Sequence, residues 1–176
     1  MSSVDQIVQG SRQMQANVWA RGRCARAFTL VEVIAVMVVL AILAGVAIPR
    51  FFDYGDKART SATQGTLGGV RGGLANFFAN EMVVNGAGLY PTLAELTTLG
   101  TVMQEALPNN PYNDRSTVEA VPTLADANSR VNTGVTGWRY YVDNTATPPI
   151  AIFYANTNDT TTAPDGSGGF LDAHEL

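Results

Sequence analysis

The chain contains one cysteine, Cys24, and one histidine, His174. A lone cysteine cannot form an intramolecular disulfide, so packing, assembly or a metal has to hold the loops of the chain together. No serine or cysteine nucleophile has a His/Asp set around it, and no glycine-rich phosphate loop follows a strand pattern. Paired carboxylates for acid–base chemistry would have to come from the C-terminal tail, which has no recognisable pocket-forming context. These absences argue against an enzyme, and no cofactor is expected to be required.

Basic side chains are scarce over most of the chain, which limits its partners. Residues 28–176 carry seven basic and fourteen acidic side chains, a net charge of −7. They contain no basic cluster of the kind that neutralises nucleic-acid phosphates, so nucleic acid is not expected as the main partner. Residues 1–27 have the opposite balance, with four arginines against the single acid Asp5.

A long apolar run follows this basic segment. From residue 28 to residue 48 every side chain is apolar, small or a hydroxyl, with the exception of Glu32. Residues 30–48 would form a helix about 28 Å long, enough to cross the hydrocarbon core of a membrane. The sequence at 44–47 imitates a secretory cleavage site, but a secretory signal normally has an apolar core of only ~7–15 residues. Since basic residues before such a run stay in the cytoplasm, we expect a single-pass inner-membrane protein with a periplasmic C-terminal portion.

Glu32 is the one charged residue in the run. A carboxylate inside a membrane helix costs about 2.5–3.5 kcal/mol on insertion scales, so an intramembrane acid predicts a function and a partner. The alternative is that Glu32 lies close enough to the cytoplasmic interface to reach water.

The residues around Glu32 form a recognisable pattern. Arg-Ala-Phe-Thr-Leu-Val-Glu at 26–32 resembles the processing site of type IV prepilins and type II secretion pseudopilins. In that family a membrane-embedded peptidase cuts before the phenylalanine and N-methylates the new terminus. The resemblance implies that residues 1–27 are a cleavable leader, cut between Ala27 and Phe28. The family usually has glycine before the cut, where this chain has Ala27.

The resemblance also implies a role for Glu32 in assembly. Cleavage would create a cationic amine at Phe28, one helical turn from Glu32, and methylation keeps its charge. When subunits pack side by side, the amine of one can neutralise the glutamate of its neighbour. A charge that is costly alone in lipid is then relieved only in the correct axial register. We therefore predict that Glu32 sets the register of a polymer and is not a catalytic acid.

Gly45 and Pro49 mark a second irregularity in the apolar run. Proline removes a backbone donor and clashes with the preceding turn, so we expect a kink or local melting over residues 45–49. A simple helix end at Ile48 is the alternative. In the family that the chain resembles, the helix resumes after the proline, and this weak point can melt as the subunit joins the filament.

Residues 28–82 are predicted to form one long stem helix, with residues 28–48 in the membrane. Beyond the proline, an apolar stripe at helical spacing predicts the face that seats a globular head; it consists of Leu67, Val70, Leu74 and Phe77 or Phe78. Five glycines occupy the same stretch: Gly65, Gly68, Gly69, Gly72 and Gly73. They either let neighbouring backbones approach closely or mark a frayed helix, and the sequence leaves both interpretations open.

The head, residues 83–176, is predicted to begin with a loop and a short helix. Thr92 and Glu95 have the spacing of a capping box and predict a helix over 92–105. The turn-rich loop 107–112 that follows resembles, in part, a proline-containing loop of major pseudopilins.

Two strand patterns, 138–142 and 150–155, are joined by a connection suited to a hairpin. They predict a small antiparallel sheet packed across the upper stem. Trp138, Tyr140 and Tyr141 are interpreted as aromatics that pack this sheet, in preference to a ligand platform. The expected fold class is α+β, the pilin fold, in which a long N-terminal transmembrane and stem helix packs on a small antiparallel sheet with a short extra helix.

The C-terminal segment 156–176 is expected to be loop-like and is rich in oxygen ligands. By itself it is an acidic tail, and its spacing does not fit the twelve-residue helix-loop-helix calcium pattern. Major pseudopilins, which the chain resembles, hold a structural calcium in an acidic C-terminal loop. That resemblance predicts calcium binding, with Asp159, Asp165 and Asp172 as candidate ligands.

Together with the resemblance, these features predict a structural subunit of a pilus-like filament, a homo-polymer built on packed stems. We favour the major pseudopilin of a type II secretion system, whose short fibre moves folded exported proteins. The major subunit of a surface type IV pilus, favoured by the long leader, is the alternative. The resemblance implies membrane lipid, prepilin peptidase, an inner-membrane assembly platform and minor pilins or pseudopilins as partners. A monomeric, membrane-anchored periplasmic binding module is the alternative of another class.

Overall fold

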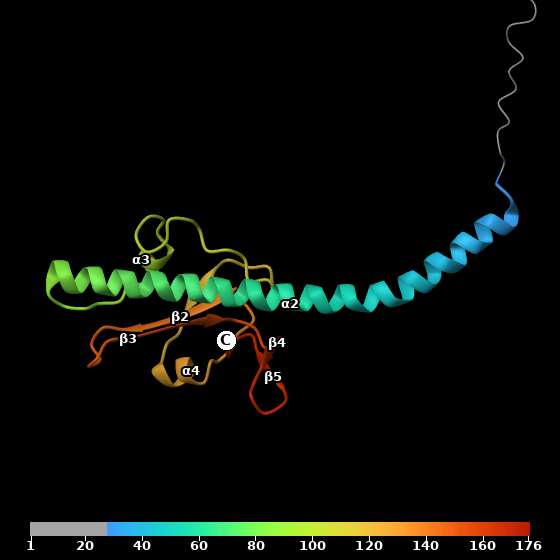
Figure 1. Ribbon diagram of the computed structural model, residues 1–176. Helices are drawn as coiled ribbons and strands as arrows, with labels where there is room; N and C mark the ends of the chain where they lie inside the picture. Colours follow the sequence, from blue (N-terminus) through green and yellow to red (C-terminus); the bar gives the residue numbers. More distant parts are fainter. Residues whose placement is uncertain (1–27) are drawn as a thin grey trace, which may run out of the picture. The chain divides into compact units, whose positions relative to one another are not determined.

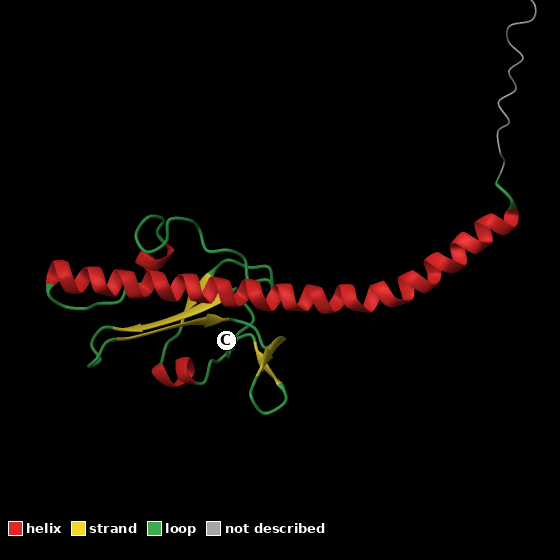
Figure 2. Ribbon diagram, in the orientation of Figure 1, coloured by secondary structure: helices red, strands yellow, loops and turns green. Residues whose placement is uncertain are grey.

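The computed structural model describes residues 28–176, so the predicted leader and its last residue, Ala27, lie outside the described residues. The helices and strands follow one another as Figures 1 and 2 show: α2 (Leu30–Asn85), α3 (Leu93–Thr97), β1 (Val118–Ala120), α4 (Leu124–Asn128), β2 (Trp138–Asp143), β3 (Ile150–Ala155), β4 (Thr160–Pro164) and β5 (Phe170–Asp172). The stem helix predicted over 28–82 corresponds to α2, which begins two residues later and ends three residues later.

The chain divides within α2 into two compact units, one that ends at Val46 and one that comprises Ala47–Leu176. In the first unit every helical residue is exposed, and the large apolar side chains are 46–75% exposed. By length and composition α2 is able to cross a membrane, with a mean hydropathy of 2.9 over 18 residues. An apolar helix without a buried face has to be covered by lipid or by other protein.

In the second unit one stripe of α2 packs against the head. Its buried members lie at intervals of three and four residues and are Thr60, Thr63, Leu67, Val70 and Leu74. The prediction is confirmed for the three aliphatic positions, whereas Phe77 and Phe78 are half-buried. Phe78 packs on Tyr90, with ring centroids 4.7 Å apart.

A three-stranded sheet in the order β1-β2-β3 lies across this stripe, and α4 lies on the other side of the sheet (Figures 1 and 2). β2 and β3 pair antiparallel, with Tyr140 opposite Phe153, and contain the two predicted strands. Trp138, Tyr140 and Phe153 bury their rings in one cluster with the α2 stripe, as expected for sheet-packing aromatics. Tyr154 belongs to the second cluster, where it packs with Ala127 of α4.

The prediction of a purely antiparallel sheet is wrong at the β1 edge. β1 was not predicted and pairs with β2 in parallel, so that Val118 lies opposite Trp138. Parallel neighbours need a crossover connection, and the chain between β1 and β2 contains α4. Tyr141 packs beside α4 in the second cluster. The start of α4 is capped by Thr123, whose hydroxyl accepts the N–H of Asp126 at 3.1 Å, and this spacing is the sequence signal for the helix.

The predicted helix over 92–105 is wrong in extent, because α3 ends at Thr97. Its capping box is confirmed. The Thr92 N–H donates to the Glu95 carboxylate at 2.8 Å, and the Glu95 N–H donates to Thr92 Oγ1 at 3.3 Å. The Thr92 hydroxyl also donates to the Glu95 carboxylate, at 2.8 Å. The two bonds that Thr92 donates, first from its N–H and then from its hydroxyl, hold the pKa of Glu95 below its ordinary value. The hydroxyls of Thr97 and Thr98 then bond back to carbonyls of the preceding turn, a competition that favours ending the helix there.

The expectation of a loop over residues 156–176 is also wrong, since β4 and β5 pair there as an antiparallel hairpin. Thr161 and Ala163 alternate inward along β4 and are buried, which is the period of a strand. The hairpin is tied to α2 by Thr60, whose hydroxyl accepts the N–H of Thr162 at 3.0 Å. The long N-terminal apolar helix, the small mixed sheets and the short helices together form an α+β pilin fold.

Gly137 lies just before β2, where two backbone segments approach closely. A Cβ at this position would lie 1.7 Å from the carbonyl oxygen of Arg115. We predict that Gly137→Ala lowers the free energy of unfolding by about 3 kcal/mol, because the two segments must move apart. The melting midpoint of the full chain in detergent, followed by near-UV circular dichroism, measures the change.

Gly72→Ala is the matched control, because a Cβ at Gly72 meets nothing within 4 Å. Alanine favours the helix over glycine by about 0.5–1 kcal/mol, so this variant is expected to melt at the same or a slightly higher temperature. Equal midpoints for the two variants would contradict the packing at Gly137.

Candidate functional site: the N-terminal turn of the apolar helix

The first turn of α2 is closed by Thr29. The Glu32 N–H donates to Thr29 Oγ1 at 3.1 Å, and the Val33 N–H donates to the Thr29 carbonyl at 3.2 Å. Thr29 is therefore the N-cap, and Glu32 is the third residue of the helix. A hydroxyl residue with glutamate three positions later is a sequence signal for a helix start. Glu32 was interpreted only from its charge, so this signal was not used.

Glu32 carries the negative charge of this first turn. The helix dipole stabilises a carboxylate at a helix N-terminus, typically by about 0.3–1 kcal/mol. Removing the carboxylate from water into a membrane costs about 2.5–3.5 kcal/mol, so the dipole offsets only part of the cost. Within residues 28–176 Glu32 has no ion-pair partner. A further positive charge is therefore needed wherever Glu32 is removed from water.

Phe28 directly precedes the cap and is 79% exposed. It lies before the first helical residue of α2. Ala27, on the other side of the predicted cut, lies outside the described residues. A cut at this junction would leave the new amine on the residue next to Thr29, so the amine and Glu32 would belong to the same N-terminal turn.

Helical geometry continues through Gly45 and Pro49, so the alternative of a helix end at Ile48 is wrong. In an α-helix the N–H of residue 49 would bond to the carbonyl of residue 45, and proline has no N–H to give. The two residues therefore form one weak point, in which the carbonyl that loses its donor belongs to a glycine. Melting of this point in a filament stays a prediction.

The glycines of α2 lie in continuous helix, so the alternative of a frayed helix is wrong. Gly73 faces Met103 and Val102, where a Cβ would come within 3.0–3.3 Å of their atoms. The other four are exposed, and a Cβ on any of them would meet nothing within 4 Å: Gly65, Gly68, Gly69 and Gly72. Their bare backbone leaves this side of α2 open to close approach by another chain.

Asp165 lies in the turn between β4 and β5. Its carboxylate accepts the N–H groups of Ser167 at 2.7 Å and Gly169 at 2.9 Å. The hydrogen bonds from Ser167, and then those from the glycines that follow it, hold the pKa of Asp165 below its ordinary value. The carboxylate is therefore ionised, and its oxygens already bond to donors of its own turn.

The other two aspartates predicted to bind calcium have separate partners. Asp172 accepts the hydroxyl of Thr160 at 3.2 Å, and Asp159 accepts the hydroxyl of Thr157. Among residues 28–176 no group of three or more histidine, cysteine, aspartate or glutamate side chains is placed to hold a metal ion. The three aspartates do not form such a group, and calcium binding stays a prediction.

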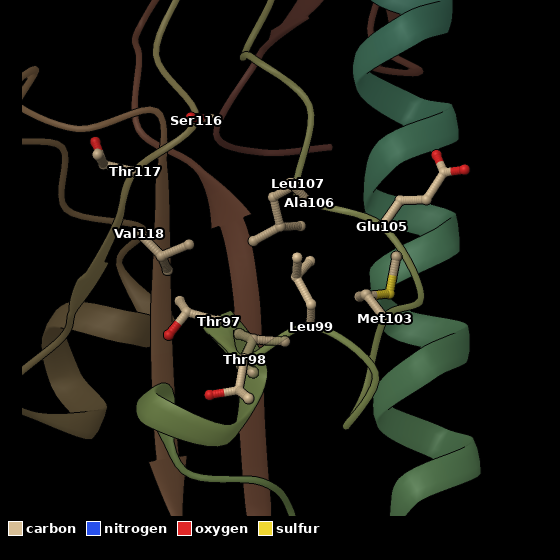
Figure 3. A pocket seen from close by; sticks show the side chains of 11 residues that line it. Thr97, Thr98, Leu99, Met103, Glu105, Ala106, Leu107, Ser116, Thr117 and Val118 are labelled. Atoms are coloured by element: carbon tan, nitrogen blue, oxygen red, sulfur yellow. The ribbon is translucent and has the colours of Figure 1, made fainter.

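A cleft of about 490 Å³ lies between α3, the loop after it and the residues that lead into β1 (Figure 3). Aliphatic and threonine side chains line most of it, among them Leu99, Leu107 and Val118. Glu105 is the ionisable residue in the described lining, and Figure 3 shows its carboxylate pointing away from Leu99 and Leu107. Acid–base or nucleophilic catalysis needs several polar groups that converge, and this cleft does not present them.

The chain is similar to a known family over its N-terminal motif and to a curated protein over a longer stretch. Residues 22–48 match the family described as "Prokaryotic N-terminal methylation motif". Over 51 residues the chain is 39% identical to the type IV narrow pilus major component PilA5 of Thermus thermophilus, a match that covers 29% of this chain and 44% of that protein. The chain therefore spans less than half the length of this curated relative. No solved structure matches it.

The matched motif includes Ala27, Phe28 and Glu32, the residues of the predicted processing and assembly site. The fold adds the long N-terminal apolar helix with small mixed sheets and short helices. The motif, the relative and the fold together support a place for the chain in the type IV pilin and pseudopilin family.

Proposed function

We propose that this chain is a structural subunit that polymerises through α2 into a pilus-like filament. The observation that carries the proposal is the helix between Leu30 and Val46, which is apolar and has no buried face. Its first turn bears the carboxylate of Glu32, which has no ion-pair partner among residues 28–176. Before assembly, lipid covers this helix, with the N-terminus in the cytoplasm and the head in the periplasm. In the filament the helices of neighbouring subunits take the place of lipid.

Processing would supply the charge that Glu32 lacks. In this proposal a prepilin peptidase cuts between Ala27 and Phe28 and methylates the new amine, which stays cationic. Two unit charges about 4 Å apart attract by about 4 kcal/mol at an effective dielectric constant of about 20. That is comparable with the cost of about 2.5–3.5 kcal/mol for a carboxylate in a membrane helix. One amine from a neighbour in the correct register is therefore sufficient compensation.

Two machines use a subunit of this kind, and different observations favour each. The long leader and the relative PilA5, a type IV narrow pilus major component, favour a surface type IV pilus. The lack of a disulfide in the head and the acidic tail favour the major pseudopilin of a type II secretion system. Because the aspartates of the tail do not gather around a metal position within the described residues, we rank the pilus first and the pseudopilin second. In either machine the partners would be an inner-membrane assembly platform and minor pilins or pseudopilins.

Glu32→Leu tests the register hypothesis. We predict that the variant inserts in the membrane and is cleaved, because its helix has no carboxylate to bury. It is expected to lose filament yield by at least about tenfold, the factor that corresponds to ~1.4 kcal/mol of lost pairing. Immunoblots of the membrane fraction and electron microscopy of sheared filaments measure the two effects separately.

Glu81→Gln is the matched control, because it removes a carboxylate near the other end of the same helix. This control is expected to assemble normally. Normal filaments from Glu32→Leu would contradict the register hypothesis. If the unmodified chain itself forms no filaments, the result favours the alternative of another class, a monomeric membrane-anchored binding module.

The choice between the two machines predicts where the filaments lie. For a surface pilus we expect long filaments outside the cell at native expression, which immunogold electron microscopy with antibodies to the head detects. Short fibres confined to the periplasm would reverse our ranking in favour of the pseudopilin.

Calcium binding by Asp159, Asp165 and Asp172 stays a prediction. For the three carboxylates to converge, Asp165 would have to leave its bonds to Ser167 and Gly169. Melting the full chain in detergent with calcium and with a chelator tests the prediction. A bound ion raises the midpoint in calcium, and Asp165→Asn removes the difference. Equal midpoints for the unmodified chain would discard the site.

A further inference from the structure

Two arginines far apart in the sequence meet at one hollow of the unit Ala47–Leu176. The hollow has a volume of about 290 Å³ and is lined by Arg71, Leu74, Arg130, Ala151, Ile152, Phe153 and Leu176. This unit carries thirteen acidic and seven basic side chains, so two adjacent positive charges are unusual in it. Within the described residues the ion pairs involve Arg59 and Arg139, and neither arginine of the hollow pairs with an acidic side chain.

Main-chain oxygens hold both guanidinium groups in place. Arg71 donates to the oxygen of Leu176 at 3.0 Å and to that of Phe153 at 3.4 Å. Arg130 donates to the oxygen of His174 at 3.3 Å, and its guanidinium carbon lies 5.4 Å from the ring centroid of Tyr154. A guanidinium group has five N–H donors, so these contacts leave donors of both arginines free to bind an anion.

The two charges disfavour each other in the absence of an anion. Partial burial and, next, the charge of Arg130 lower the pKa of Arg71 from its ordinary value. Arginine remains protonated in proteins, so the repulsion persists in the folded chain, and an anion bound between the two groups would relieve it. The carbonyl oxygens of Phe153 and His174, which accept hydrogen bonds from these arginines, carry only partial charges.

We propose that the hollow between Arg71 and Arg130 is a binding site for a carboxylate that carries a short aliphatic group. The planar guanidinium fork matches a carboxylate with two parallel hydrogen bonds. Leu74, Ile152 and Leu176 supply an apolar wall for the aliphatic part. The volume of about 290 Å³ is large enough to admit an acid of a few carbon atoms.

Such a carboxylate has two sources. One is a free organic acid. The other is a terminal carboxylate on Leu176, where the chain ends at that residue, since Arg71 already contacts its main-chain oxygen. A phosphate ion shares the charge but has no apolar part for the wall of the hollow.

Thermal melting of the full chain in detergent tests the site, with sodium butyrate as the probe and sodium chloride and sodium phosphate at equal ionic strength as references. If the site is not already filled, butyrate is expected to raise the melting midpoint by several degrees, and the rise levels off as the butyrate concentration increases. The rise is expected to be lost in Arg71→Gln and in Arg130→Gln. It is expected to persist in Arg59→Gln, which changes an exposed arginine of the same helix that pairs with Asp56.

A second protein separates the two sources: the chain lengthened by two residues after Leu176. If the terminal carboxylate fills the site, the original chain does not respond to butyrate, whereas the lengthened chain melts lower in chloride and butyrate restores its midpoint. If the ligand is a free acid, the original chain responds and lengthening leaves its midpoint in chloride unchanged. Each result supports a carboxylate site.

The proposal is overturned if butyrate raises the midpoint of neither chain, or if phosphate or chloride raises it equally. It is also overturned if the response persists in both glutamine variants. If Arg71→Gln is too unstable to melt cooperatively, Arg71→Lys takes its place, because lysine keeps the positive charge but lacks the planar pair of donors of a guanidinium group. This variant is expected to raise the half-saturating butyrate concentration at least fivefold, and an unchanged concentration counts against the site.

Discussion

The structure depends on one constraint, which is that the apolar side chains around the whole circumference of α2 between Leu30 and Val46 must be kept from water. Lipid satisfies this constraint for the apolar side chains but not for the carboxylate of Glu32. The Thr29 cap and the helix dipole reduce the cost of that charge without cancelling it. In a polymer, packed helices cover the apolar side chains and a neighbour's positive charge compensates the Glu32 carboxylate. The lower free energy of Glu32 in the polymer than in lipid would favour assembly.

The head covers only one side of α2. It takes one stripe of α2, from Thr60 to Leu74, and builds its core there with Trp138, Tyr140 and Phe153. Four glycines on the remaining surface of α2 keep that side free of side chains. The C-terminal hairpin is fixed to the same helix through the buried Thr60. Packing within the subunit thus leaves the outer side of α2 available for neighbours.

Local pattern explains which features could be predicted from the sequence. The apolar run, the buried stripe, the capping box at Thr92 and the strands β2 and β3 each carry their own periodicity or spacing. β1 has only three residues and is a strand because it pairs with β2, so no local sequence pattern predicts it. Arg71 and Arg130 line one hollow together with residues of β3, and the C-terminal hairpin places Asp172 opposite Thr160. Such non-local placements cannot be read from spacing. The spacing of Thr29 and Glu32 could have predicted the helix cap, but Glu32 was interpreted only as a charge in the membrane.

The central claim is that Glu32 of one subunit meets the amine of Phe28 of another. Filaments co-assembled from two pools, one labelled with ¹⁵N at the Phe28 amine and the other with ¹³C at the Glu32 carboxyl group, test it by solid-state NMR dipolar recoupling. The account predicts a coupling between the pools that corresponds to an ion-pair separation of about 4 Å or less. A coupling that occurs only when both labels are on the same chain, or no coupling at all, would contradict it.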